Sequence, residues 1–299
     1  MRKVSIRIKI FTVIATLFLL NSFFVNSIAK DVILDGTISP VELNGKYGYI
    51  DNSGKQIIPP QFEYADNFSE GLARVLINGK YGYIDKTGKK IISPKFDYAD
   101  YFIEGVARVK NNEKYGYVDK TGKLIVKPQF DFADQYFTEG FARIKINEKY
   151  GYVNKTGKLI VKPQFDSADH FIDGIARVNI KKKYGYINKL GKYIITPKFD
   201  SAGYFKEGLA YIEINKKYGY VDTKGNIKIK PQFTKAGNFG QGLAPVKVKN
   251  KWGYVDKTGK LLVKPQFDEA YAFEGNIALI KKGGKFGYMD KTRKITIYP

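Results

Sequence analysis

The sequence predicts an all-β protein made of eight repeated units in an open, twisted, solenoid-like array. Three observations carry this prediction: a Gly-Tyr pair after an aromatic residue recurs eight times, the segments around it alternate as strands do, and a proline follows at constant spacing. A period of 20–50 residues is typical of stacked units that cannot bury an apolar face alone. The steps are all 34 residues except one of 35, and the glycines are Gly48, Gly82, Gly116, Gly151, Gly185, Gly219, Gly253 and Gly287.

A closed β-propeller is the alternative architecture, because eight units would supply enough blades for a ring. Two features favour the open form. Each unit contains three strand-like segments instead of four, and no split unit joins the two ends of the chain.

The third unit shows what each segment is expected to form. The segment 106–110 alternates between apolar and polar residues and predicts a first strand, and 114–119 predicts a second. In the turn that follows, Asp119 can accept hydrogen bonds from the backbone and Gly122 can adopt a positive φ. The segment 123–126 predicts a third strand that stops at Pro128, since proline cannot donate to the sheet.

The rest of this unit, residues 129–140, is expected to be a packed connector. It is compatible with one helical turn, because Phe130, Ala133 and Phe137 recur at the spacing of a helical face. The two tyrosines beside Gly116 lie on one face of their strand, so their copies are expected to form rows of rings along the stack. Gly116 itself indicates a place where a neighbouring backbone or ring approaches closely.

These motifs resemble the WG (KWG) repeat family of bacterial proteins. The segment 251–260, Lys-Trp-Gly-Tyr-Val-Asp-Lys-Thr-Gly-Lys, is the best match, and Pro-Gln-Phe-Asp-x-Ala and Glu-Gly-Leu-Ala or variants of them recur further along the first seven units. Elsewhere Tyr or Phe stands in place of the tryptophan, so a ring is kept. The resemblance implies a repeat protein that is often exported, and it implies no catalytic residues and no cofactor.

The first 29 residues are similar to an export signal. Four basic residues and no acidic residue precede an apolar stretch from Ile10 to Leu20, and Ser27 and Ala29 suit signal-peptidase cleavage after Ala29. The alternative is an uncleaved membrane anchor, because 10–28 is almost long enough to span a bilayer. In both cases we expect an extracellular or envelope-associated protein. The predicted division is 1–29 as signal peptide, 30–37 as a short lead and 38–299 as the repeat array.

The charge of the chain points to an anionic partner. The formal net charge is +22, and it is still +18 without the four basic residues of the signal. Such a charge attracts polyanions, although lysine can also serve solubility alone. Since only seven of the basic residues are arginines, we expect diffuse attraction, with no more than non-specific binding to nucleic acid. The expected partner is an anionic cell-wall polymer or a protein, and none is expected inside the cell.

The inventory of reactive side chains argues against an enzyme. The chain has no cysteine and one histidine, His170, at a position that varies between units and is expected at the surface. Thiol nucleophiles and Cys/His zinc sites are therefore excluded, and one Asp among lysines makes a poor calcium site. The recurring turn carboxylates are expected to cap turns. They are Asp51, Asp85, Asp119, Asp222, Asp256 and Asp290, with Asn154 and Asn188 in the other two units.

Five residues are candidates for binding. Arg74, Arg108, Arg143 and Arg177 occupy one repeat position in the first half of the array, and Trp252 is the tryptophan of the best-matching motif. The arginines could form a basic stripe that follows a linear anionic polymer, with rings beside it to stack on sugars or bases. The alternative is that their stems pack over rings.

The sequence therefore predicts a non-catalytic binding or scaffolding protein at the bacterial cell surface. A structural wall-associated spacer without a specific ligand is the alternative. A glycan hydrolase that uses two of the carboxylates ranks third, because it needs a pair at fixed distance in unlike environments. The identity of the ligand and the oligomeric state stay open.

Overall fold

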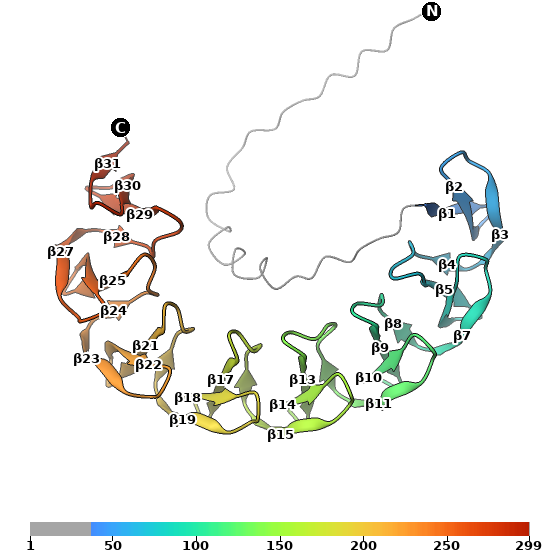
Figure 1. Ribbon diagram of the computed structural model, residues 1–299, viewed down its shortest axis with the longest axis horizontal. Helices are drawn as coiled ribbons and strands as arrows, with labels where there is room; N and C mark the ends of the chain where they lie inside the picture. Colours follow the sequence, from blue (N-terminus) through green and yellow to red (C-terminus); the bar gives the residue numbers. More distant parts are fainter. Residues whose placement is uncertain (1–36, 299) are drawn as a thin grey trace, which may run out of the picture.

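The computed structural model describes residues 37–298, which form eight antiparallel sheets placed one after another along an open arc (Figure 1). The first and last sheets lie at opposite ends of the arc, so the expected open array is confirmed. The predicted signal peptide and residues 30–36 of the lead lie outside the described residues. Within 37–298 every regular element is a strand, and no helix could cross a membrane.

The sheets are numbered here from first to eighth. The first contains β1 (Ile38–Leu43), β2 (Lys46–Asp51) and β3 (Gln56–Phe62), and the second β4 (Tyr64–Ala65), β5 (Ala73–Ile77), β6 (Lys80–Ile84) and β7 (Lys90–Phe96). The third contains β8 (Tyr98–Ala99), β9 (Val106–Asn111), β10 (Lys114–Asp119) and β11 (Leu124–Phe130), and the fourth β12 (Phe132–Ala133), β13 (Phe141–Ile146), β14 (Lys149–Asn154) and β15 (Leu159–Phe165).

The second half repeats this arrangement. The fifth sheet contains β16 (Ser167–Ala168), β17 (Ile175–Ile180), β18 (Lys183–Asn188) and β19 (Tyr193–Phe199), and the sixth β20 (Ser201–Ala202), β21 (Leu209–Ile214), β22 (Lys217–Asp222) and β23 (Ile227–Phe233). The seventh contains β24 (Lys235–Ala236), β25 (Leu243–Val248), β26 (Lys251–Asp256) and β27 (Leu261–Phe267), and the eighth β28 (Glu269–Ala270), β29 (Ile277–Lys282), β30 (Lys285–Asp290) and β31 (Ile295–Ile297).

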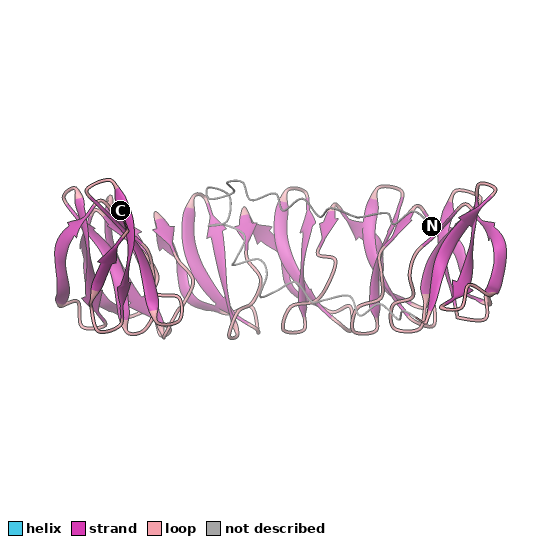
Figure 2. Ribbon diagram, turned by 90° about the horizontal axis from the view of Figure 1, so that it is seen from above, coloured by secondary structure: helices cyan, strands magenta, loops and turns pink. Residues whose placement is uncertain are grey.

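Each sheet after the first begins with a two-residue strand that the sequence analysis assigned to the connector. In the fourth sheet, Phe132 and Ala133 pair with Lys145 and Ile144, so the segment expected to hold a helical turn is extended. The short strand forms one edge of the sheet and the third long strand forms the other. Figure 1 shows the third long strands on the outer side of the arc, and Figure 2 shows the connecting loops gathered at its two opposite rims.

The third long strand does not stop at its proline. β11 runs through Pro128 to Phe130, and its register against β10 shifts twice, across Gly116 between Tyr115 and Tyr117 and again between Tyr117 and Val118. A Cβ at Gly116 would lie 2.5 Å from the Val126 carbonyl oxygen and 2.7 Å from the Pro128 nitrogen. The prediction of a close approach at Gly116 is therefore confirmed. The end predicted for this strand was wrong, because the proline lies at an edge and bulge, where its missing N–H is tolerated.

The hydrophobic core is divided into clusters that each join two neighbouring sheets. In one cluster Tyr117 and Phe130 of the third sheet contact Ala133, Phe137 and further apolar side chains of the fourth. Phe130, Ala133 and Phe137 are thus buried as predicted, although Phe130 and Ala133 lie in strands and Phe137 lies in the irregular connector. Because each sheet buries its faces only against its neighbours, stability is expected to be a sum over adjacent pairs.

The expected rows of tyrosine rings are replaced by ring pairs between sheets. Tyr117 is fully buried, and its ring lies 4.9 Å from that of Phe137 in the next sheet. Its hydroxyl donates to the backbone carbonyl of Asp134, also in the next sheet. Tyr115 is only half-buried and lies beside Arg108. The two tyrosines of one motif therefore have different roles, because the bulge at Gly116 separates them.

Candidate binding surface

The four candidate arginines lie on the first long strands of the second to fifth sheets. Each pairs with an aspartate that follows the short strand of its own sheet, as Arg108 Nε does with Asp100 Oδ2 at 2.7 Å. The Arg108 side chain is 16% exposed and that of Asp100 is 5% exposed. Burial by itself would lower the pKa of Arg108, but the nearby charge of Asp100 raises it above its usual value. The four pairs are Arg74–Asp66, Arg108–Asp100, Arg143–Asp134 and Arg177–Asp169.

Each guanidinium also contacts the next sheet. Arg108 Nη1 donates to the backbone carbonyl of Ala133 at 2.7 Å, and Arg143 Nη1 donates to that of Ala168 at 3.0 Å. Arg74 and Arg177 make the same bond to Ala99 and Ala202. These bonds occupy part of the donors that a polymer would need. The arginines therefore link neighbouring sheets, and a role in ligand binding stays a prediction.

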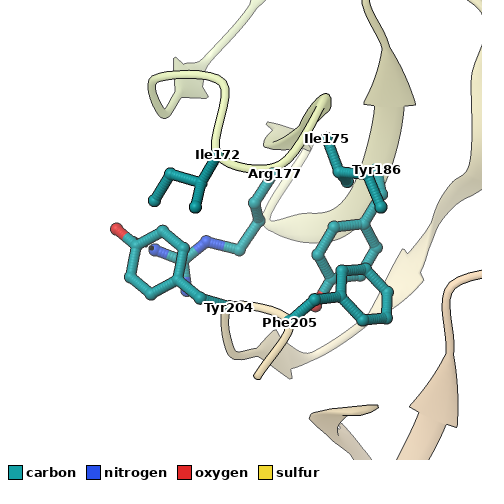
Figure 3. A pocket seen from close by; sticks show the side chains of 6 residues that line it. All are labelled: Ile172, Ile175, Arg177, Tyr186, Tyr204 and Phe205. Atoms are coloured by element: carbon teal, nitrogen blue, oxygen red, sulfur yellow. Dashed lines mark hydrogen bonds between the residues drawn. The ribbon is translucent and has the colours of Figure 1, made fainter. Parts of the chain in front are cut away.

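Aromatic rings surround these guanidinium groups. Arg177 lies 4.6 Å from the ring centre of Tyr204 in the sixth sheet, and both line a small cavity between the fifth and sixth sheets (Figure 3). Ile172, Ile175, Tyr186 and Phe205 complete the lining. Contacts of this kind stabilise a partly buried arginine through cation–π attraction.

The aspartates were missed by the sequence analysis, although a signal was present. Where the arginine is lost in later units, the aspartate eight residues earlier is lost as well. The sixth sheet has Gly203 with Tyr211, and the seventh has Gly237 with Pro245. The same backbone bond is kept, from Asp100 N to Arg108 O at 2.9 Å and from Gly203 N to Tyr211 O at 2.9 Å. Aspartate and arginine thus behave as one structural unit.

The remaining candidate, Trp252, is half-buried in β26. It pairs with Lys247 on β25 and with Phe267 on β27, and it packs against the core between the seventh and eighth sheets. Its ring therefore has a packing role, while a ligand at this position stays a prediction.

The single histidine lies between two sheets, so the surface position expected for it was wrong. The His170 side chain is 20% exposed, with Nδ1 3.5 Å from Asp134 Oδ2 and 3.3 Å from Thr138 Oγ1. Its ring is parallel to that of Tyr136, with 6.3 Å between the centres. Burial lowers the pKa of His170, although the charge of Asp134 acts in the opposite direction.

The turn carboxylates cap their turns, as predicted. Asp119 Oδ1 accepts hydrogen bonds from the backbone N–H groups of Thr121 at 2.9 Å and Lys123 at 3.0 Å. Asn154 accepts the same two bonds from Thr156 and Lys158. Hydrogen bonds to an ionised carboxylate lower its pKa, and the turn aspartates all show this direction.

These turns lead to a prediction for acid stability. The side chain of Asn226 is the main cause that lowers the pKa of Asp222 to about 2. A lowered pKa in the folded state stabilises the protein above the unfolded value of about 3.9, and this stabilisation is lost as the pH falls towards 2. We expect Asp222→Asn to reduce the loss of stability between pH 5 and pH 2.5, measured by urea unfolding. An unchanged pH dependence would contradict this assignment, and Asn154→Ala, at a cap that does not titrate, is the control.

Most other carboxylates hold the sheets together through lysines. Glu139 accepts hydrogen bonds from the N–H groups of Asp173 at 2.7 Å and Gly174 at 3.0 Å in the fifth sheet, and it pairs with Lys189 at 3.0 Å. Further turn lysines pair with a glutamate of the preceding sheet: Lys120 with Glu70, Lys155 with Glu104 and Lys257 with Glu207. The lysines that begin the second long strands pair with connector aspartates: Lys80 with Asp97, Lys114 with Asp131, Lys149 with Asp166, Lys183 with Asp200 and Lys251 with Asp268.

The arrangement contains no cluster of three or more His, Asp or Glu side chains that could hold a metal ion, as far as residues 37–298 are concerned. The recurring turn and connector carboxylates and the four candidate arginines bind protein groups. The groups left at the surface include exposed lysines without an acidic partner.

Comparisons with known proteins agree with the repeat architecture. A family model described as "WG containing repeat" matches seven successive segments: 47–81, 81–115, 115–150, 150–184, 184–218, 218–252 and 252–286. No curated protein sequence matches the chain.

Similar solved structures are distant. The structure of a eukaryotic initiation factor is 13% identical with a TM-score of 0.40, and the match covers 88% of this chain and 84% of that one. Hsv2p of Kluyveromyces lactis is 8% identical with a TM-score of 0.37, covering 77% and 94%. The dihydro-heme d1 dehydrogenase NirN is 12% identical with a TM-score of 0.37, covering 88% and 73%.

Proposed function

The chain belongs to the family of WG-containing repeats, and on this premise we propose a non-catalytic binding or scaffolding protein at the bacterial cell surface that contacts an anionic polymer of the envelope. The observation that carries the proposal is the distribution of charge. The recurring carboxylates are used within the fold as turn caps and ties, whereas the net charge stays strongly positive at +22, or +18 without residues 1–29. A surface of this kind attracts polyanions over several ångströms.

Export is part of the proposal and depends on residues 1–29, whose basic start, apolar stretch and Ser27-x-Ala29 site support cleavage after Ala29. An uncleaved anchor would place the array at the same surface of the membrane. A protein partner is the other candidate contact.

A wall-associated spacer is the second candidate function. It is favoured by the many ties between neighbouring sheets, such as Arg108 to Ala133 and Glu139 to Gly174, which make each junction between sheets stiff. A glycan hydrolase has less support, because the connector aspartates and turn aspartates already bind lysine and backbone N–H groups.

The test is retention on isolated cell walls. We expect the protein to sediment with walls in 50 mM salt and to be released by 500 mM salt, because binding driven by counterion release falls steeply with salt. Walls stripped of their anionic polymers are the control and should retain little protein. Retention that is equal at both salt concentrations would contradict the electrostatic proposal and favour a neutral glycan or a protein partner. No retention at all would favour the spacer.

A further inference from the structure

The outer strands carry a regular row of lysines. The outer strands are the third long strands of the sheets. In six successive sheets, from the second to the seventh, this strand contains a proline, and one residue beside the proline is a lysine. It precedes the proline in Lys-Pro-Gln of β11, β15, β23 and β27, and it follows the proline in Ser-Pro-Lys of β7 and Thr-Pro-Lys of β19. This set is called the outer lysine row and consists of Lys95, Lys127, Lys162, Lys198, Lys230 and Lys264.

Core packing does not explain the row. In β11 the buried residues are Val126 and Phe130, whereas Lys127 and Gln129 on either side of Pro128 are exposed. All six lysines of the row are exposed. A packing contact would fix the lysine at one position, but the charge moves from one side of the proline to the other while one lysine beside each proline is kept. What recurs is a positive charge at this place on each outer strand.

The charges of the row are not neutralised by the fold. None of the six outer strands contains Asp or Glu, and none of the six lysines has an ion pair within residues 37–298. Lys127 thus differs from Lys114 and Lys120 in the same sheet, which pair with Asp131 and Glu70. Since the outer strands lie on the convex side of the arc, the row follows that side from sheet to sheet (Figure 1).

We propose that the outer lysine row is the contact surface for a flexible linear polyanion that carries phosphate groups, laid along the convex side of the arc. The proposal rests on the proposed function and adds to it the surface and the chemical class of the ligand. Sheets packed face to face are about 10 Å apart, and neighbouring sheets diverge towards the convex side of the arc (Figure 1). Lysines of neighbouring sheets are therefore separated by more than the Debye length of about 8 Å at physiological salt, so each lysine attracts its own stretch of polymer. Each contact is weak, and affinity grows with the number of linked contacts.

Protection of the edge strand is the competing explanation. Lysine and proline on an exposed edge prevent pairing with another chain, and a charge of either sign serves that purpose. Lys→Glu substitutions therefore separate the two roles, because they keep a charge on each edge and reverse its sign.

The experiment uses the full chain and long-chain inorganic polyphosphate as the probe, with the dissociation constant measured by titration at several salt concentrations. The row variant carries Lys127→Glu, Lys162→Glu, Lys230→Glu and Lys264→Glu. The matched control carries four changes of the same charge at exposed lysines that follow the turns: Lys123→Glu, Lys158→Glu, Lys192→Glu and Lys260→Glu. Thermal melting and gel filtration check that both variants are folded and monodisperse.

We expect the affinity of the row variant for polyphosphate to fall by roughly 100-fold at low salt, whereas the affinity of the control falls less than tenfold. The slope of log affinity against log salt concentration should become shallower by about 0.7 for each lysine replaced in the row variant. Equal losses in both variants would show diffuse attraction and overturn the row as the site. If both variants bind polyphosphate as the wild type does, with the same dependence on salt, the row is not the binding site. The proposed function would then stand, and the lysines of the row would serve edge protection. If the wild-type chain itself does not bind polyphosphate but is retained on cell walls, the phosphate class is wrong while the function stands.

Discussion

Replacing Gly151 with valine is expected to lower the free energy of unfolding by about 2 kcal/mol or more. A Cβ at this position would lie 2.4 Å from the Val161 carbonyl oxygen and 2.8 Å from the Pro163 nitrogen, both backbone atoms of the neighbouring strand. Backbone atoms cannot rotate away as a side chain can, so β15 would have to leave β14. Urea unfolding followed by circular dichroism measures the change.

The control places the same side chain on an exposed strand position. Ser167→Val in β16 adds two methyl groups in place of a hydroxyl at an exposed residue, and we expect a change within about 0.5 kcal/mol. If the free energy of unfolding of Gly151→Val equals that of the wild type within error, the close approach of β14 and β15 is not needed for stability.

The sequence was sufficient to predict the period, the three longer strands of each unit and the open array, but not the fourth, two-residue strand that seven of the eight sheets contain. The spacing of the glycines gave the number of units, and Gly116 indicated a close contact, because a missing side chain within a strand has few other physical causes. Asp119 and Gly122 were predicted correctly as turn residues, since their roles depend only on local backbone geometry.

Features that depend on the neighbouring sheet were not predicted. The strand of Phe132 and Ala133 is too short to show an alternating pattern, and it exists because it pairs with Lys145 and Ile144. β11 runs through Pro128 because Gly116 makes room at the bulge, which is visible only when both strands are in place.

The candidate site shows the same limit. The arginines were identified as a recurring set, but each has one partner in its own sheet and another in the next, as Arg108 has Asp100 and the Ala133 carbonyl. A period within one sequence reveals which positions are equivalent, and it does not reveal which side chains meet. The joint loss of the aspartate and the arginine in the sixth sheet was the signal that could have found the pairs.

This joint loss leads to the second large effect that we expect. Asp100→Gly should lower the free energy of unfolding by about 3 kcal/mol or more, because it leaves the guanidinium of Arg108, which is 16% exposed, without its counter-charge. The added flexibility of glycine contributes up to about 1 kcal/mol of this. Urea unfolding of Asp100→Gly and of the wild type measures the cost.

The double variant Asp100→Gly with Arg108→Tyr separates the ion pair from general damage to the sheet. It copies the sixth sheet, where a Cβ on Gly203 would lie 2.5 Å from the ring of Tyr211, so glycine and tyrosine fit together there. We expect the double variant to recover most of the stability and to come within about 1.5 kcal/mol of the wild type, because no buried charge is left unpaired. The single variant Arg108→Tyr is measured beside Asp100→Gly. If the loss of stability in the double variant equals the sum of the losses in these two single variants, the pair is not a unit, and the arginine is free to serve a role outside the fold.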